Sequence, residues 1–241
     1  MSPSSFEVTA ESVLYLYNSV SAERLARPHS HKTAMGLYSK YVLPRIIDLA
    51  MRNKETTHLR AEWIPRARGN VLEIGIGSGL NLPFYSSAVT HVYGVDPSIE
   101  LQRIAHKKQA IDASWVEFLT QSAEQPLTLG ISSIDSAVIT WTLCSIPEPD
   151  RALREVRRVL KESGRLIFVE HGHSPDPRVA KAQDLLTPFW KRIGGGCHLN
   201  REIAELITAA GFQIIELKTN YLPGPRPMTY TYQGLAEPRY S

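Results

Sequence analysis

Three glycines at alternating positions, Gly75, Gly77 and Gly79, have the spacing in this sequence that points most clearly to chemistry. They follow residues 70–74, an apolar run typical of a buried strand, so the chain should leave a strand through a glycine turn. Because glycine has no Cβ, such a turn lets backbone N–H groups come close to a ligand. Glu73 stands just before the turn and adds a carboxylate to it.

A second carboxylate, Asp96, ends the apolar run 91–95. It lies 21 positions after Gly75 (96 − 75), about the separation at which an acid binds a ribose in a Rossmann-type βαβ unit. The dinucleotide fingerprint G-x-G-x-x-G/A would need a small residue at position 80, where the sequence has Leu80. The pattern therefore favours a nucleoside-containing cofactor other than a dinucleotide.

Residues 73–79 resemble motif I of the class I S-adenosylmethionine-dependent methyltransferases, E/D-x-G-x-G-x-G. The resemblance implies that S-adenosylmethionine binds here and leaves as S-adenosylhomocysteine. It implies that Asp96 binds the ribose hydroxyls and that the loop residues contact the rest of the cofactor, with Pro97 and Thr140 beside them. The loop residues are Glu73, Gly75, Gly77 and Gly79.

Residues 121–124 resemble the G-x-A-E/D segment of the same family, with Gln121 or Ser122 at the small first position. The resemblance implies that Ala123 and Glu124 meet the adenine amino group. The alternative is a helix-capping turn of the Ser-x-x-polar type.

Further segments resemble two branches of the family. Residues 152–164 resemble the E-x-x-R-V-L-K-P-G-G block of the ubiquinone/menaquinone-biosynthesis-type methyltransferases, with Ser163 in place of proline. Residues 143–145, 170–171 and 196–201 resemble the L-C-S, E-H and G-C-x-L-T-R segments of the thiol S-methyltransferases. The second branch is the nearer resemblance, because three separate segments agree.

The candidates for the acceptor side are Thr142, His171 and His198. Thr142 follows a predicted strand, and His171 ends another, at the edge where ligands bind in open α/β sheets. A histidine there can act as a base or shape the acceptor pocket, or it can simply bond a neighbouring carbonyl. Cys144, Cys197 and His198 lack metal-site spacing, so we expect no metal and two cysteines acting as small buried hydrophobes.

Strands alternating with helices are predicted from residue 70 onward, which indicates an α/β fold with a mostly parallel sheet and helices on both faces. The expected strands are 70–75, 91–96, 114–119, 134–140, 165–170, 212–218 and 228–236. The expected helices between them are 79–86, 98–109, 150–160 and 200–210. The family resemblance implies a Rossmann-like seven-stranded sheet with an antiparallel C-terminal hairpin.

Two further helices, 35–51 and 58–64, are expected before the first strand. We therefore predict an N-terminal helical lid segment over 1–64 and a cofactor-binding domain over 65–241. A lid insertion is predicted at 171–199, with a short helix near 179–186. The role of residues 1–33 stays open.

Composition excludes several other classes of protein. At 241 residues, 43% hydrophobic and 21% charged, the chain is typical of one globular α/β domain. A net charge of +3 gives no argument for nucleic acid, and no apolar run is long enough for a membrane span. Two cysteines and no signal peptide favour a cytoplasmic location, and we expect a monomer or homodimer without the sequence deciding between them.

The sequence thus predicts methyl transfer from S-adenosylmethionine to a small-molecule thiol, amine, hydroxyl or carbon. Whether the reaction needs a general base stays open. The alternatives are a nicotinamide-dependent oxidoreductase and a non-catalytic subunit that binds S-adenosylmethionine.

Overall fold

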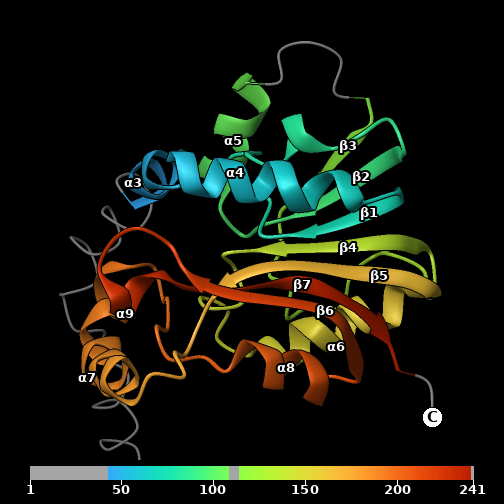
Figure 1. The fold of residues 1–241 in the computed structure, drawn as a ribbon. Helices are drawn as coiled ribbons and strands as arrows, with labels where there is room; N and C mark the ends of the chain where they lie inside the picture. The colour runs from blue at the N-terminus through green and yellow to red at the C-terminus, as the bar shows by residue number, and fades with distance from the viewer. Residues whose placement is uncertain (1–42, 109–113, 240–241) are drawn as a thin grey trace, which may run out of the picture. The chain divides into compact units, whose positions relative to one another are not determined.

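Seven strands form a single sheet in the order β3-β2-β1-β4-β5-β7-β6 (Figure 1). The computed structural model describes residues 43–108 and 114–239, which all belong to one compact unit, Ser39–Ser241. Strands β1 to β5 pair in parallel, and β7 runs antiparallel to both β5 and β6. The strands are β1 Gly69–Ile74, β2 Val89–Val95, β3 Val116–Leu119, β4 Ile134–Thr140, β5 Leu160–His171, β6 Phe212–Tyr221 and β7 Tyr230–Pro238.

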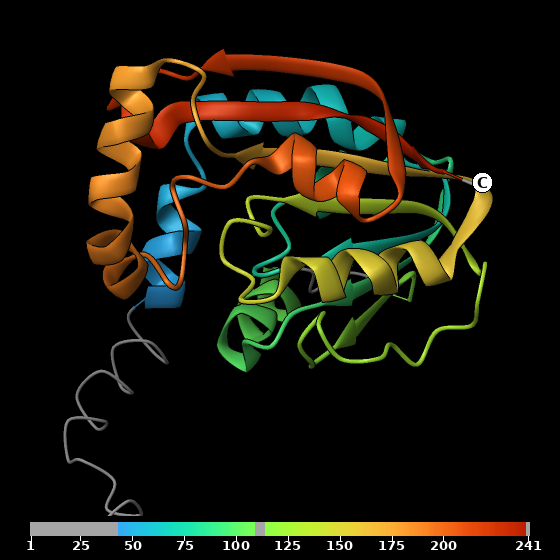
Figure 2. The same cartoon turned by 90° about the horizontal axis from the view of Figure 1, so that it is seen from below.

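Helices cover both faces of this sheet, with α4 on one face and α6 and α8 on the other (Figures 1 and 2). The predicted seven-stranded, Rossmann-like architecture with an antiparallel C-terminal hairpin is therefore confirmed. The helices are α3 Leu43–Ala50, α4 Lys54–Trp63, α5 Ile99–Lys108, α6 Pro149–Val159, α7 Pro177–Ile193, α8 Ile203–Ala209 and α9 Arg226–Thr229.

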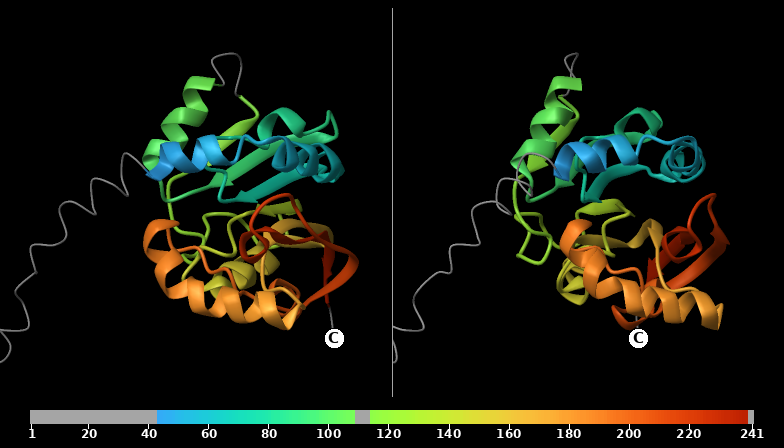
Figure 3. Two further views of the ribbon diagram at one scale, coloured as in Figure 1. Left: turned by 60° about the vertical axis from the view of Figure 1, so that its left-hand side comes forward. Right: turned by 90° about the vertical axis from the view of Figure 1, so that its left-hand side faces the viewer.

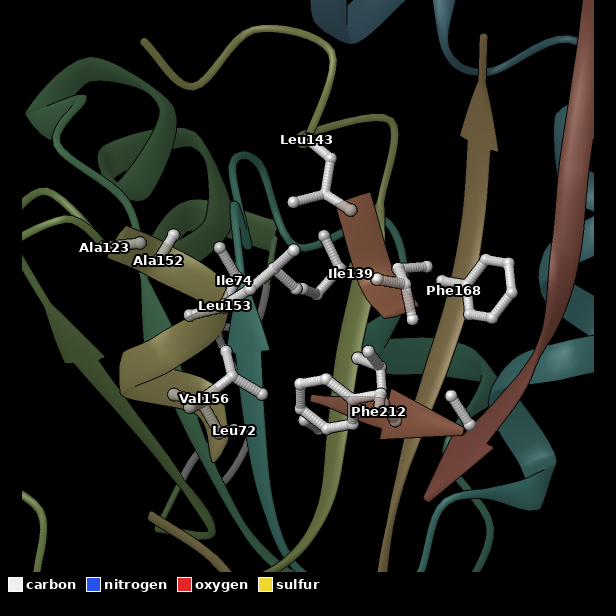
Figure 4. Packing of buried hydrophobic residues seen from close by; sticks show 14 of the residues in the cluster. Leu72, Ile74, Ala123, Ile139, Leu143, Ala152, Leu153, Val156, Phe168 and Phe212 are labelled. Atoms are coloured by element: carbon white, nitrogen blue, oxygen red, sulfur yellow. The ribbon is translucent and has the colours of Figure 1, made fainter. Parts of the chain in front are cut away.

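The core follows from the two-residue period of the strands, which sends successive side chains to opposite faces. In β1, Val71 packs with Leu59 and Trp63 of α4. Its neighbour Leu72 joins the other cluster, which contains Leu153 of α6 (Figure 4). Because both faces of β1 are buried, apolar side chains occupy successive positions in it, Val71 and Leu72, instead of alternating with polar ones.

The helix expected over 79–86 is wrong. The structure has a turn and a short 3-10 helix, Leu82–Phe84, with Pro83 inside it. Tyr85 then leaves the helix in an extended conformation and sends its hydroxyl back to Glu73. That hydrogen bond to the end of β1 replaces the next helical turn.

Other boundaries also differ from expectation. Helix α4 starts four residues early, at Lys54, because the Asn53 side chain caps it by accepting from Thr56 N. Helix α6 ends at Val159, and β5 begins at Leu160 with a register shift before the main pairing at Arg165. Of the predicted helix 35–51, residues 35–42 lie outside the described residues, as does the whole of 1–33.

The insertion over 171–199 contains one long helix where a short one was expected. Helix α7 spans 17 residues and includes Pro188. Both α3 and α7 stand at the edge where the parallel strands end (Figures 1 and 3). Among the described residues, no helix is long and apolar enough to cross a membrane.

Candidate functional site

A cavity of about 520 Å³ lies at the carboxyl ends of β1, β2 and β4. Its position is the one expected for a ligand in an open α/β sheet. The lining brings together most of the sequence-predicted cofactor residues, namely Glu73, Gly75, Gly77, Asp96, Pro97, Ala123, Glu124 and Thr140. Thr142 lines the same cavity.

The glycine loop adopts a backbone that other residues rarely take. Gly75, Gly77 and Gly79 have φ angles of 74°, 53° and 72°, all in the left-handed region. At Gly75 a Cβ would also lie 2.1 Å from Thr142 Oγ1. The loop after β1 and the loop after β4 therefore touch only because position 75 has no side chain. Gly79 does not line the cavity and packs behind the loop, against Leu82.

Asp96 lies at the end of β2, in the cavity wall, with both carboxylate oxygens facing backbone donors. Oδ2 accepts from Gly77 N at 3.0 Å and Oδ1 accepts from Ser98 N at 2.7 Å. Burial raises the pKa of this carboxyl group, and the two backbone hydrogen bonds partly offset the rise. Each oxygen keeps a lone pair, so the carboxylate can accept from two neighbouring ligand hydroxyls.

Glu73 is buried in a polar network that sequence reasoning missed. Its two oxygens accept from Asn81 Nδ2 and from the Tyr85 hydroxyl, each at 2.8 Å. Asn81 in turn donates to Thr140 Oγ1 at 3.0 Å and accepts from Arg60 Nε at 3.0 Å. The network fixes Glu73 and Thr140 in the cavity wall.

Burial dominates the ionisation of this network. It raises the pKa of Glu73 to about 7, against the lowering effect of the Tyr85 and Asn81 hydrogen bonds and of the Arg60 charge. It also lowers the pKa of Arg60 to about 10. The Arg60 guanidinium stays charged below that value and lies 4.7 Å from the Trp141 ring centroid.

On the far side of the cavity, Ala123 and Glu124 follow β3. Glu124 Oε2 accepts from Ser122 Oγ at 2.8 Å, and Oε1 accepts from Glu148 N at 2.6 Å. The side chain is thus held by its own turn and by the start of α6. The cofactor roles predicted for Pro97, Ala123 and Glu124 stay predictions, although all three line the cavity.

The loop after β4 is held by a second buried acid, Glu170, at the end of β5. Its Oε1 accepts from Thr142 N at 2.6 Å and from Leu143 N at 2.9 Å. Trp141, the residue before Thr142, has a φ of 49°, which is uncommon for a bulky residue. The anchoring by Glu170 stabilises this strained turn, which carries Thr142 to the cavity.

Two segments from outside the sheet complete the lining. Asp48 of α3 is buried and accepts a hydrogen bond from Ser78 Oγ of the glycine loop. Gly195 belongs to the turn after α7 and approaches Leu43 and Ile47 of α3. Residues from both predicted lid segments therefore line the cavity, while the closing motion itself stays a prediction.

His171 and His198 do not line the cavity. His171 Nε2 lies 2.8 Å from Cys197 Sγ. His198 Nδ1 lies 3.2 Å from the Cys144 carbonyl oxygen, and burial together with the Arg201 charge lowers the pKa of this histidine. Their assignment to the acceptor side stays a prediction, and their observed contacts are with the two cysteine segments.

The residues that sequence reasoning missed are Asp48, Arg60, Asn81, Tyr85 and Glu170. A weak signal existed for some of them. Asn81 and Tyr85 follow the glycine loop closely, and Glu170 was noticed only as the neighbour of His171. Arg60 gave no signal, since the sequence of α4 shows little apolar patterning that would separate its buried face from its exposed one.

Comparison with known proteins shows that this chain is similar to methyltransferases. A family model described as a methyltransferase domain matches residues 72–168. The thiol S-methyltransferase TMT1B of Rattus norvegicus is 38% identical over 151 residues, 61% of this chain and 62% of that protein. Human thiol S-methyltransferase TMT1A is 30% identical over 177 residues, 70% of this chain and 71% of that protein.

A solved structure of a SAM-dependent methyltransferase from Methanosarcina mazei has the same fold, with a TM-score of 0.59 and 25% identity. The match covers 73% of this chain and 95% of that one. The matched region spans 62–63% of the length of the rat, mouse and human TMT1B proteins.

Proposed function

Because the chain belongs to the class I S-adenosylmethionine-dependent methyltransferases, we propose that it transfers a methyl group from S-adenosylmethionine to the thiol of a small molecule. The observation that carries the proposal is the cavity in which the glycine loop, Asp96 and the β4 loop meet. The similarity to thiol S-methyltransferases supports the thiol as acceptor.

The residues of the cavity fit this cofactor. Left-handed glycines keep side chains out of the space beside the loop, and a Cβ at Gly75 would collide with the opposite wall. Asp96 offers two carboxylate oxygens, each of which accepts one backbone hydrogen bond and can still accept from a ribose hydroxyl. The sulfonium of the cofactor supplies an electrophilic methyl carbon when it is bound.

The chain itself contributes by binding the cofactor and the acceptor, orienting them and excluding water. Holding the acceptor in line with the methyl carbon converts a bimolecular step into an intramolecular one, which supplies much of the acceleration. Ile47 of α3, Met51 just after this helix and Ile146 of the loop after β4 give the cavity an apolar wall that suits an apolar acceptor.

A thiol acceptor reduces the need for a base. An ordinary thiol has a pKa of about 8.5, so a useful fraction is already thiolate near neutral pH. Glu73, one of the buried carboxylates of the cavity wall, has both oxygens engaged by protein donors, which fits an acceptor that does not require a base. The nicotinamide oxidoreductase alternative is not favoured, because the matching proteins are methyltransferases.

A matched set of acceptors tests the proposal. The full chain is incubated with S-adenosylmethionine and benzyl mercaptan, benzylamine or benzyl alcohol, which differ only in the accepting atom. We expect benzyl methyl sulfide and S-adenosylhomocysteine from the thiol alone, detected by mass spectrometry. The Asp96→Ala variant is expected to lose the activity, and Glu162→Gln, an exposed carboxylate, to keep it.

The outcomes separate the two parts of the proposal. Methylation of benzylamine but not of the thiol would overturn the acceptor and leave the cofactor assignment in place. A thermal melt with S-adenosylmethionine or S-adenosylhomocysteine tests the cofactor assignment itself. A melting temperature that neither ligand changes would overturn it. We further propose a reducing, cytoplasmic setting, which the two unbonded cysteines support.

A further inference from the structure

Three soft metal-ligating side chains converge beside the cavity, although they are far apart in the sequence. Cys144 comes from the loop after β4, His171 from the end of β5, and Cys197 from the turn before α8. Their ligand atoms all lie within 4.8 Å of one another. We propose that these three residues form a binding site for a thiophilic divalent ion, with Zn²⁺ as the best fit.

The donor set matches the chemistry of such an ion. Two thiolates and an imidazole are soft or borderline ligands, which select zinc over magnesium or calcium. Binding releases the two thiol protons, so a Zn²⁺ ion with two thiolates and a neutral histidine has no net charge. A neutral complex is what a buried position tolerates, and Cys144 is only 2% exposed.

The geometry needs little adjustment. Around a tetrahedral zinc with bonds of about 2.3 Å to sulfur and about 2.0 Å to nitrogen, neighbouring donors stand roughly 3.5–3.8 Å apart. His171 Nε2 and Cys197 Sγ are 2.8 Å apart, so this pair has to open by less than about 1 Å. Side-chain rotations of that size need no change in the strands.

Two buried polar atoms of residues next to one another at the end of β5 also lack a partner in the described part of the chain. His171 Nδ1 and Glu170 Oε2 are buried and have no hydrogen-bond partner among the described residues. A disulfide between the two cysteines would leave both atoms as they are. A metal ion at Nε2 instead fixes the imidazole tautomer that carries its proton on Nδ1, so the protonation of the buried ring is defined.

The proposed ion has a structural consequence for the cavity wall. Ser145 and Ile146 follow Cys144 directly, and Gly195 lies two residues before Cys197; all three line the cavity. A bound ion would therefore cross-link the β4 loop, the end of β5 and the turn after α7. The inference concerns binding and stability, so it does not depend on the acceptor or on methyl transfer.

The test starts with the reduced, metal-free full chain. Zn²⁺ is titrated against a chromophoric chelator, and Co²⁺ is added to a separate sample as a spectroscopic substitute. We expect one ion per chain and a thiolate-to-cobalt charge-transfer band whose intensity corresponds to two thiolates. Bound zinc should also raise the melting temperature.

Variants assign the ligands. Cys144→Ser, Cys197→Ser and His171→Gln should each weaken zinc binding by more than the roughly 10–100-fold that loss of an outer-shell partner costs. The matched control is His198→Gln, because this histidine contacts the Cys144 carbonyl but lies outside the ligand set. It should bind zinc as the wild type does.

Three results would overturn the inference. They are no stoichiometric binding by the wild type, zinc binding by the three ligand variants as tight as that of the wild type, and a Cys144–Cys197 disulfide that persists in a glutathione buffer. Should a variant fail to fold, the wild type alone decides the question. The chain has only two cysteines, so a cobalt spectrum without thiolate bands counts directly against the site.

Discussion

The Asp96 carboxylate accepts a hydrogen bond from the backbone N–H of Gly77 at 3.0 Å, and so joins the end of β2 to the turn that follows β1. The contact places the Asp96 carboxylate and the backbone of the glycine loop, which has no side chain at positions 75 and 77, on the same wall of the cavity. It also means that the residue predicted to bind the ribose supports the shape of the glycine loop.

Replacing Asp96 should therefore affect both binding and folding. In Asp96→Ala, the N–H groups of Gly77 and Ser98 lose their acceptor, which costs about 1–3 kcal/mol of unfolding free energy. Loss of the charged ribose contacts should weaken S-adenosylmethionine at least about tenfold. Urea unfolding and calorimetric titration measure the two effects. Unchanged cofactor affinity would show that Asp96 serves the loop alone.

The Gly75→Ala substitution tests the contact between the two loops. The new methyl group would meet Thr142 at 2.1 Å in a backbone conformation that alanine disfavours. We expect a loss of stability of more than about 1 kcal/mol, together with weaker cofactor binding. Gly130→Ala is the control, because the nearest atom to its Cβ is 3.8 Å away. Equal effects of the two substitutions would contradict the proposed contact.

Glu73 should make stability depend on pH. Its pKa is raised from 4.5 to about 7 by burial, so the folded state favours the protonated carboxyl group. The stabilisation is complete below pH 4.5 and is lost as the pH rises through about 7, with a total on the order of 3 kcal/mol.

Glu73→Gln removes this titration, so the variant should gain stability relative to the wild type between pH 5 and pH 8, as measured by urea unfolding across that range. Glu170, whose buried carboxyl group has a pKa raised in the same direction, is present in both proteins and cancels in the comparison. Parallel stability profiles would show that Glu73 keeps an ordinary pKa in the folded protein.

Arg60 offers a test of the buried network. Arg60→Lys keeps the charge but cannot bond Asn81 Oδ1 and the Met51 carbonyl from one planar group. We expect a loss of roughly 3 kcal/mol of unfolding free energy. The control is Arg66→Lys, since Arg66 also lies over a tryptophan but pairs with Glu216 at an exposed position. That change should cost less than about 1 kcal/mol. A similar loss in both variants would argue against the network.

The parts of the site that could be predicted from sequence depend on short-range patterns. The glycine loop and Asp96 could be recognised because strand, turn and acid follow one another at a fixed spacing. The antiparallel C-terminal hairpin was implied by the family resemblance, and β6 and β7 indeed pair antiparallel.

The rest depends on contacts between distant segments, which no local pattern reveals. Arg60 and Asn81 are 21 positions apart, and Glu170 holds the Thr142 backbone across 28 positions. The helix expected after the glycine loop was wrong because Tyr85 bonds Glu73 instead of continuing the turn. The grouping of Cys144 with His171, where sequence reasoning considered His198, likewise depends on where β5 ends.

Both cysteines of the chain are largely buried, so a labelling reagent should reach neither thiol readily. A cysteine introduced at Leu49 of α3, which is 75% exposed, would be the sole reactive position. A fluorophore or spin label attached there would test whether α3 moves when a ligand binds in the cavity. Burial of the two natural thiols therefore makes the protein suitable for spectroscopy with a single attached label.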